Sequence, residues 1–254
     1  MDGTTRYTQA NRVGWDKFAA SRPAAGAQFF LDGQVTLDEW EARLLGDVTG
    51  RRLLHLACAN GNDTLSWAVL GASVTGVDIS AAGIEVARRT AAATGLDANF
   101  VVADVYELPA DLPAFDVVYI SAGGICWMPD LDRWAQIVHD RLLPGGIAAV
   151  FEHHPLWEVL AAADGTLSLQ FDYFSRQPHA LAATDASKRP GGWVPDAALM
   201  SFVWPLGDVL TSLVRAGLRL THVSEHPVPA MFSGLGPRAG WLPASYAILA
   251  QRPG

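Results

Sequence analysis

Apolar and amphipathic stretches alternate along the chain from residue 51 to residue 154. Short apolar runs such as "RLLHLA", "SVTGVDIS" and "FDVVYIS" are typical of buried strands. Between them, apolar residues recur every three or four positions, as at Leu65, Ala68, Val69 and Ala72, which is the spacing of a helix. Strands that alternate with helices are typical of βαβ units, so we predict a doubly wound, mostly parallel α/β sheet with helices on both faces.

The same pattern predicts where one helix ends and the next strand begins. In "DLDRWAQIVHDRLLPGG", Leu131, Trp134 and Val138 form one apolar stripe, and the Pro-Gly-Gly sequence at residues 144–146 is expected to end the helix. The run "IAAVFEHH" that follows is apolar enough for a central strand.

The alternation stops between residues 155 and 205, where glycines and prolines are interspersed among aromatic residues. We interpret residues 155–205 as an insertion that forms a cap, and residues 206–254 as a helix and strands that complete the sheet. Residues 1–50 contain the helix-like run "TLDEWEARLLG" and are predicted to form helices outside the sheet. The α/β core is therefore expected to span residues 51–154.

Composition narrows the class of protein. Of the 254 residues, 50% are hydrophobic and 17% are charged, which is typical of a compact globular chain. The net charge of −8 and the lack of a Lys/Arg cluster argue against nucleic acid as the partner. Two cysteines, Cys58 and Cys126, fit a reducing compartment, and neither a signal peptide nor an apolar run of about 18 residues is evident. We therefore expect a cytoplasmic protein that does not enter a membrane.

The turn "LHLACANGNDT" follows the first predicted strand, at the place where open α/β sheets bind their ligands. Ala57 and Ala59 are small enough for a ligand to approach the backbone, provided that their φ angles are negative. Gly61 is then expected to be the one position in the turn that requires glycine.

The spacing of this turn argues against a dinucleotide. A G-x-G-x-x-G fingerprint that starts at Ala57 would place its third glycine at Asn62. Asp63 adds a carboxylate at the start of the next helix, where a pyrophosphate needs free N–H groups. A ligand that carries an ammonium group would tolerate Asp63 better, although Asp63 is also compatible with stabilising the helix dipole.

Two consecutive predicted strands end in an acidic residue. Asp78 follows "VTGV", where a carboxylate can accept hydrogen bonds from both hydroxyls of a ribose. Asp104 ends "FVVA" in the same relative position on the next strand. Asp78 has an alternative role as the N-cap of the following helix, which Ser80 would fill as well. We interpret both aspartates as nucleotide-binding.

Together, the segments "LLHLACANG", "VTGVDIS", "FVVADVYELP", "FDVVYIS", "RLLPGG" and "IAAVFE" resemble class I S-adenosylmethionine-dependent methyltransferases. The resemblance covers roughly residues 51–154 and is weaker through "AGLRLTHVSEH" and "YAILAQRP". It implies a Rossmann-like, seven-stranded sheet whose last strand is antiparallel. It also implies S-adenosylmethionine as the cofactor, S-adenosylhomocysteine as the product and a small-molecule substrate, as in bacterial biosynthetic methyltransferases.

The resemblance implies contacts with each part of the cofactor. The turn at residues 57–61 would pass under the methionine moiety, and Asp78 would bind the ribose hydroxyls. Ile79 would pack on the adenine, and Asp104 with Val105 would meet the adenine edge.

Other implied contacts come from the fourth strand and the N-terminal helices. Ser121 would lie beside the methionine chain and the reacting methyl group, and Tyr7 and Trp15 would close over the cofactor. The chain departs from the family at His55, where an acidic residue is common, and at the two alanines of the turn, where glycines are common. The residues expected to bind the cofactor are Tyr7, Trp15, Ala57, Cys58, Ala59, Gly61, Asp63, Asp78, Ile79, Asp104, Val105 and Ser121.

Methyl transfer needs a nucleophile held in line with the sulfonium methyl group, and a base only where the acceptor must lose a proton. His153 and His154 end the fifth predicted strand, on opposite sides of it, and are the candidate bases. A histidine that only binds backbone groups at a strand end is the alternative. Glu152, Tyr173 and His226 are weaker candidates for the base.

Aromatic residues in the predicted cap favour a largely apolar organic acceptor. Trp157, Tyr173 and Trp193 are the candidate substrate-binding residues, although the same rings are compatible with the core of a small subdomain. No metal site is expected, because adjacent histidines cannot easily chelate one ion and Mg²⁺ prefers oxygen ligands.

The sequence therefore favours a methyltransferase that acts on oxygen, nitrogen or carbon of a small molecule. The alternatives are an NAD-dependent oxidoreductase and a non-catalytic protein that binds S-adenosylmethionine. A monomer or a homodimer is expected.

Overall fold

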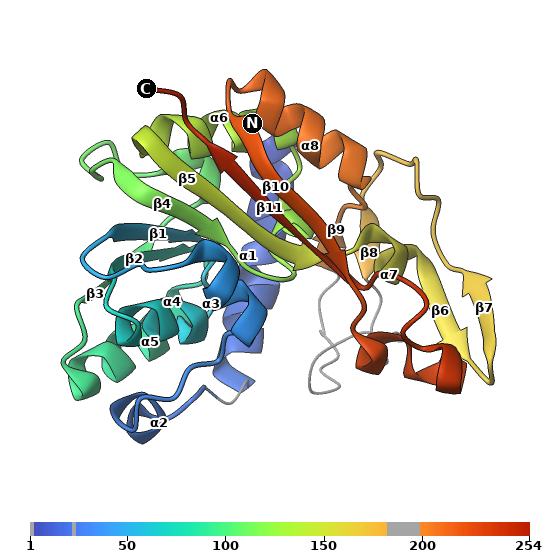
Figure 1. Cartoon of the computed structure of the whole chain (residues 1–254), viewed down its shortest axis with the longest axis horizontal. Helices are drawn as coiled ribbons and strands as arrows, with labels where there is room; N and C mark the ends of the chain where they lie inside the picture. The colour runs from blue at the N-terminus through green and yellow to red at the C-terminus, as the bar shows by residue number, and fades with distance from the viewer. Residues whose placement is uncertain (1–2, 22–23, 182–198) are drawn as a thin grey trace.

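The computed structural model describes residues 3–21, 24–181 and 199–254. Its centre is a seven-stranded sheet in the order β10-β11-β5-β4-β1-β2-β3 (Figure 1). Strands β1 to β5 run parallel to one another, whereas β11 is antiparallel to both of its neighbours. This arrangement confirms the predicted doubly wound sheet with its last strand antiparallel. The strands are β1 (Arg52–Leu56), β2 (Ser73–Asp78), β3 (Ala98–Val102), β4 (Phe115–Ile120), β5 (Leu142–His153), β10 (Arg219–His226) and β11 (Ser245–Gln251).

Alternate residues of the central strands pack against helices on opposite faces. In β4, Val118 and Ile120 join the core under α6 and α8, whereas Val117 and Tyr119 join the core under α3 and α4 (Figure 1). Helices α2 and α5 cover the β3 end of the second face. In the parts of the chain that the structure describes, no helix combines the length and the apolar character that crossing a bilayer requires. The helices are α1 (Gly3–Ser21), α2 (Ala27–Leu31), α3 (Glu39–Leu45), α4 (Asn62–Val69), α5 (Ala81–Thr94), α6 (Leu131–Arg141) and α8 (Leu206–Arg215).

The chain between β5 and α8 forms small elements of its own. Helix α7 (Pro155–Val159) is followed by the hairpin of β6 (Leu160–Ala163) and β7 (Thr166–Leu169). Strands β8 (His179–Leu181) and β9 (Leu199–Ser201) form a second antiparallel pair. The hairpin packs on η5 (Pro229–Arg238), the 3₁₀ segment between β10 and β11. Trp193 lies outside the described residues.

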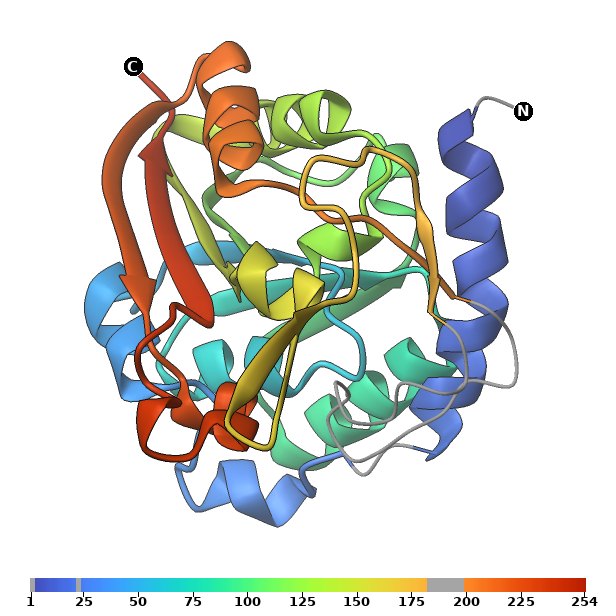
Figure 2. The same ribbon diagram turned by 90° about the vertical axis from the view of Figure 1, so that its right-hand side faces the viewer.

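Helix α1 runs along one side of the molecule (Figure 2). Asp16 Oδ1 accepts hydrogen bonds from Ser80 Oγ (2.9 Å) and Ala82 N (3.1 Å) at the start of α5, where a carboxylate is favourable. Asn11 exchanges two hydrogen bonds of 2.8 Å with the backbone of Met200 in β9. Helix α1 therefore connects the α/β core to the segment between β5 and α8.

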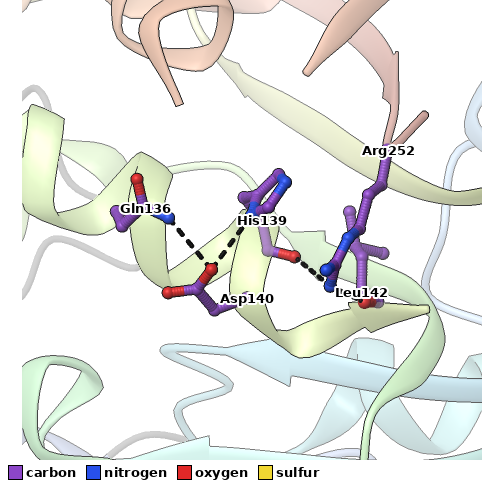
Figure 3. Close-up of polar contacts among 5 residues, drawn as sticks. All are labelled: Gln136, His139, Asp140, Leu142 and Arg252. Carbon is purple, nitrogen blue, oxygen red and sulfur yellow. Dashed lines mark hydrogen bonds and ion pairs between the residues drawn. The ribbon is translucent and has the colours of Figure 1, made fainter. Parts of the chain in front are cut away.

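Helix α6 ends at Arg141, before the Pro-Gly-Gly sequence that was expected to end it, and β5 starts at Leu142. The physical reason is Arg252, which follows β11. Its Nη1 donates to the carbonyl oxygens of His139 (3.2 Å) and Leu142 (2.5 Å) (Figure 3). The end of the chain thus satisfies carbonyl groups that the end of a helix leaves without partners.

Replacing Arg252 should remove its hydrogen bonds to the end of α6 and destabilise the fold. We expect Arg252→Ala to lower the free energy of unfolding by about 1–2 kcal/mol, because the last carbonyl groups of α6 lose a charged donor. Arg219→Ala is the matched control, since Arg219 is exposed and its guanidinium donates to the side chain of Gln251 at 2.5 Å. Its loss should cost less than about 0.5 kcal/mol. Equal losses in urea unfolding of the two variants would contradict the role given to Arg252.

Candidate active site

A cavity of about 380 Å³ lies at the carboxyl ends of β1, β2, β3 and β4. It follows from the topology, because the connections after β1 and β4 pass to opposite faces of the sheet and leave a crevice between them. All of the expected cofactor-binding residues except Tyr7 and Gly61 line it. The lining consists of Thr8, Asn11, Trp15, Thr36, Ala57, Cys58, Ala59, Asn60, Asn62, Asp63, Asp78, Ile79, Asp104, Val105, Ser121, Ala122, Gly123, Gly124, Trp127 and Met128.

The turn after β1 contains three left-handed residues. Ala57, Ala59 and Gly61 have φ angles of 56°, 50° and 77°. The expectation that the two alanines have negative φ is therefore wrong, and each pays the roughly 1–2 kcal/mol that this conformation costs an L-residue. The conformation is held from outside the turn, because Ala59 N donates to Asp78 Oδ2 at 2.8 Å.

Gly61 is needed for packing as well as for its positive φ. A Cβ at this position would lie 2.7 Å from Ala87 Cβ in α5 and 2.8 Å from the ring of Phe100 in β3. Both neighbours belong to the protein interior, so Gly61 fixes the turn and does not contact the cavity. Gly61 is not among the lining residues, and its direct contact with the cofactor stays a prediction.

Asp78 is the best-buried carboxylate of the cavity lining, with 8% of its surface exposed. Its two oxygens accept hydrogen bonds from Ala59 N and Ser80 N, both at 2.8 Å. Burial raises the pKa of Asp78 to about 6, and these hydrogen bonds oppose the shift. The side chain of Ser80, not Asp78, caps α5 by accepting from Gly83 N at 3.0 Å.

Two more carboxylates face the cavity. Asp104 lies beyond the end of β3, and its Oδ1 accepts a hydrogen bond from Tyr106 N at 3.0 Å. Asp63 lies in the first turn of α4, and its Oδ1 accepts from Thr36 Oγ1 at 2.6 Å. Among the described residues that line the cavity, none is a lysine, an arginine or a histidine. The cavity therefore has a strongly negative lining.

His55 lies beneath this lining, on β1, with 1% of its surface exposed. Its Nδ1 is 2.8 Å from Thr64 Oγ1, and its Nε2 is 3.1 Å from Ser121 Oγ. Burial lowers the pKa of His55 to about 4, so the ring is neutral near pH 7. Of these three residues, only Ser121 lines the cavity.

Residues 121–128, the post-β4 segment, form one wall of the cavity. Glu152 in β5 holds the backbone of this segment, since its carboxylate accepts hydrogen bonds from Gly123 N and from Ile125 N (2.7 Å). A third donor is His153 N, at 2.7 Å from Glu152 Oε1. Glu152 is buried, and burial raises its pKa to about 7. With its oxygens occupied by N–H groups, Glu152 orders the wall and is not placed to act as a base.

Aromatic rings from α1 and the post-β4 segment meet at the cavity. Trp15 and Trp127 both line it and pack edge to face, with ring centroids 5.1 Å apart. Tyr7, the other residue expected from α1, instead packs against Phe202 (5.4 Å) outside the lining. Sequence reasoning missed Trp127 and its neighbour Met128, whose only signal is their place after the fourth strand in "AGGICWMP".

His153 and His154 point to different sides of β5, as consecutive strand residues do. His154 Nε2 lies 2.8 Å from Glu225 Oε1, and its Nδ1 accepts a hydrogen bond from Leu156 N (3.1 Å) at the start of α7. Both ring nitrogens are therefore occupied away from the cavity. This geometry gives His154 a helix-capping role and corrects its assignment as a base.

His153 lies directly behind the cavity wall. Its Cε1 and Nδ1 are 3.6 and 3.7 Å from the place that a Cβ on Gly123 would occupy, and Gly123 lines the cavity. The ring of Trp157 covers His153 from another side, at 4.7 Å between centroids. Burial lowers the pKa of His153 to about 4, so this imidazole is also neutral near pH 7.

The remaining predicted residues lie away from the cavity. Trp157 contacts His153 and Tyr173 packs against Phe174 (5.1 Å), but neither lines the cavity. His226, a weaker candidate for the base, stacks on Trp40 at 4.3 Å on the far edge of the sheet. Within the residues that the structure describes, no cluster of histidine, cysteine or acidic side chains is arranged to hold a metal ion.

Comparison with known proteins places this site in a family. Residues 53–146 match a family described as a methyltransferase domain. Phthiotriol/phenolphthiotriol dimycocerosates methyltransferase of Mycobacterium leprae is 33% identical over 120 residues, or 44% of this chain and 43% of that protein. Malonyl-acyl-carrier-protein O-methyltransferase of Enterobacter lignolyticus is 27% identical over 180 residues, or 68% of this chain and 66% of that protein. The chain thus spans less than two thirds of each of these relatives.

A solved structure extends the similarity to the whole fold. The crystal structure of an S-adenosylmethionine-dependent methyltransferase from Mesorhizobium loti is 26% identical, with a TM-score of 0.65, and the match covers 87% of this chain and 100% of that one. Residues 53–146 therefore match a methyltransferase domain, and the fold is that of the S-adenosylmethionine-dependent methyltransferase superfamily. The enzyme class of the superfamily is methyltransferase, and its cofactor is S-adenosylmethionine, as the sequence predicts.

The left-handed alanines of this methyltransferase domain allow a test of the turn. We expect Ala57→Gly and Ala59→Gly each to raise the free energy of unfolding by about 0.5–1 kcal/mol. Relief of the left-handed strain outweighs the greater freedom that glycine gives the unfolded chain. The matched control is Ala92→Gly on the exposed face of α5, which should lower the free energy by about 0.5–1 kcal/mol. A loss of stability at all three positions in urea unfolding would show that the turn is not strained.

Proposed function

We propose that this protein transfers the methyl group of S-adenosylmethionine to a small, largely apolar organic acceptor. The observation that carries this proposal is the charge of the cavity. Asp63, Asp78 and Asp104 line it, and no cationic side chain is among its described lining residues. Such a lining favours a ligand of net positive charge. S-adenosylmethionine has a sulfonium and an ammonium group against one carboxylate.

The residues around the cavity fit the parts of this cofactor. Asp78, at the tip of β2, is where a carboxylate accepts hydrogen bonds from two ribose hydroxyls. Ile79 and Val105 offer apolar surface for an adenine ring. Asn60, in the turn, has a buried Nδ2 without a hydrogen-bond partner among the described residues, so the turn still has an unmatched donor.

Bound S-adenosylmethionine would supply a methyl group already activated by its sulfonium. The protein then has to hold the acceptor in line and exclude water, and such positioning is worth about 7–11 kcal/mol in intramolecular reactions. The post-β4 segment, fixed by Glu152, provides a rigid wall for this purpose. Trp15, Trp127 and Met128 add large apolar side chains to the lining, which supports an apolar acceptor.

Of the two histidines expected at the end of β5, His153 is our candidate base. It lies next to Gly123, which has no side chain to separate it from the cavity wall. Because its pKa is lowered to about 4, it can accept a proton near pH 7 but is a weak base. It would therefore serve an acceptor whose own proton is already acidic.

The aspartates of the cavity lining also bear on the two alternative functions. The pyrophosphate of a dinucleotide would face three carboxylates without a cation, so an NAD-dependent oxidoreductase is not favoured. A non-catalytic protein that binds S-adenosylmethionine would have the same cavity, and only a methyl-transfer assay separates it from an enzyme. The cytoplasmic location and the monomer or homodimer stay predictions.

Binding of S-adenosylhomocysteine, measured by calorimetry between pH 5 and pH 8, tests the cofactor site. The ribose hydroxyls need ionised Asp78, whose pKa in the empty cavity is about 6. We therefore expect the Kd to be constant above about pH 7 and to rise by up to about tenfold per pH unit below about pH 6. Asp78→Asn should weaken binding by roughly 10- to 100-fold and remove this pH dependence.

Asp104→Asn is the control for this titration, because Asp104 lies at the tip of the neighbouring strand and should leave the slope unchanged. A slope that survives in Asp78→Asn would assign the titration to another group, such as Glu152. Wild-type protein that binds no adenosyl ligand would disprove the proposed function.

Transfer of a labelled methyl group to a panel of small molecules tests whether His153 or His154 acts as a general base. We expect His153→Ala to lower kcat by about 100-fold, the lower end of what general bases contribute. His154→Ala should leave kcat within about twofold and instead lower the free energy of unfolding by about 1–2 kcal/mol, because α7 loses its cap. Full activity of His153→Ala across the pH range would show that no histidine base is used.

A further inference from the structure

Asn11, on helix α1, lines the cavity but directs its amide to another part of the chain. Its Nδ2 donates to Met200 O and its Oδ1 accepts from Met200 N, both at 2.8 Å, and Asn11 is 3% exposed. Facing residues of two antiparallel strands exchange the same pair of hydrogen bonds. Because β9 also pairs with β8, Asn11 takes the place of a neighbouring strand on the other edge of β9.

A second contact fixes the position of α1 along β9. Gly14 lies one turn after Asn11, and a Cβ at Gly14 would collide with the buried side chain of Leu199 in β9. Moving α1 away from β9 would leave the amide of Asn11 and the backbone groups of Met200 without partners in the interior, which is costly. We therefore expect α1 and β9 to move as one unit.

The chain that continues from β9 holds the opposite wall of the cavity. We call residues 199–204 the β9 strap. Phe202 N donates to Cys126 O at 2.8 Å, and Trp204 Nε1 donates to Met128 O at 2.9 Å. Both carbonyl groups belong to the post-β4 segment, whose Met128 lines the cavity. The β9 strap thus contacts α1 on one side and the post-β4 segment on the other.

None of residues 199–204 is among the residues that line the cavity. A ligand in the cavity can therefore affect the β9 strap only through the walls that the strap connects. A ligand that fixes α1 would reach the strap at Met200, and the strap would pass the constraint to the post-β4 segment at Phe202 and Trp204. Packed and hydrogen-bonded elements of this kind carry energetic coupling between sites.

We propose that Asn11 is a positioning residue that couples cofactor binding to the post-β4 segment through the β9 strap. This proposal rests on the proposed function, because it requires a cofactor in the cavity that α1 lines. A cofactor that fixes α1 also fixes the carbonyl groups of Cys126 and Met128, and with them the wall against which the acceptor packs. The acceptor site is then complete only after the cofactor has bound, so the cofactor binds first and the acceptor second.

Hydrogen exchange of the Phe202 amide tests this coupling, with S-adenosylhomocysteine as the ligand. The readout is the ratio of its exchange rates without and with the ligand, at a concentration that saturates each variant in calorimetry. Asn11→Asp keeps the size of the side chain but places a carboxylate oxygen against Met200 O, whereas Asn11→Ala removes both hydrogen bonds. Gln9→Ala is the matched control, because Gln9 is an exposed amide on the same helix.

We expect the ligand to slow the exchange of Phe202 by about tenfold or more in the wild type and in Gln9→Ala, because opening of the strap then requires α1 to move as well. In Asn11→Asp and Asn11→Ala the ratio should fall below about twofold. The reference is the amide of Gly165, which donates to Gly234 O at 2.8 Å and is not part of the cavity lining. Its exchange should change less than about twofold in every protein.

Other results overturn the proposal in distinguishable ways. Asn11 variants that exchange faster but keep the wild-type ratio would make Asn11 a structural residue only. A wild-type ratio near one, or equal slowing of Phe202 and Gly165, would show that the strap is not coupled to the cavity. In each case the proposed function would stand, because calorimetry still shows that S-adenosylhomocysteine binds. A wild type that does not bind it would overturn the proposed function, and this proposal with it.

Discussion

The candidate site is organised by one buried carboxylate at the tip of β2. Asp78 accepts hydrogen bonds from Ala59 N and Ser80 N, so a single side chain fixes the turn after β1 and the start of α5. Burying this charge is costly, as its raised pKa shows, and the left-handed alanines add backbone strain in the same place. Both costs lie at the cavity, where a rigid backbone and a partly desolvated carboxylate are useful to a ligand.

Burial sets the charge state of the whole site. It lowers the pKa values of His55 and His153 and raises those of Asp78 and Glu152, so each buried group is shifted toward its neutral form. The histidines are therefore uncharged near pH 7, while Asp63 and Asp104, which are less buried than Asp78, add acidic side chains to the lining. The cavity attracts cations without placing any cationic side chain of its own among the described lining residues.

The sequence predicted the parts of the site that depend on local pattern. The apolar run of β2 ends in Asp78, and Asp104 follows that of β3, so both carboxylates lie at one edge of a parallel sheet. The turn between β1 and α4 lies beside them for the same reason. The positive φ angles of the alanines were not predictable, since they depend on a hydrogen bond from a different strand. The end of α6 likewise depends on Arg252, which is remote in sequence.

The direction of side chains explains most of the other differences between the site expected from the sequence and the site in the structure. Tyr7 turns to Phe202 and His154 turns to Glu225, partners that no periodicity reveals. Trp127 reaches the cavity from a segment that has no regular spacing, so its pattern carried no signal. Most of the predicted residues that line the cavity lie at strand ends or in the turn after β1, where the backbone fixes the direction of the side chain.

The hydrogen bonds between Glu152 and the backbone of the post-β4 segment have a consequence for how its sequence can change. This carboxylate holds the N–H groups of Gly123 and Ile125, which every residue except proline possesses, and it makes no demand on the side chain at position 125. The backbone of the segment therefore does not depend on which side chain Trp127 presents to the cavity, whereas Ile125 and Met128 are held by the core. The backbone of the wall and the side chain that faces the cavity are thus fixed by separate interactions. Related enzymes could therefore differ in their acceptors while the cofactor site stays the same.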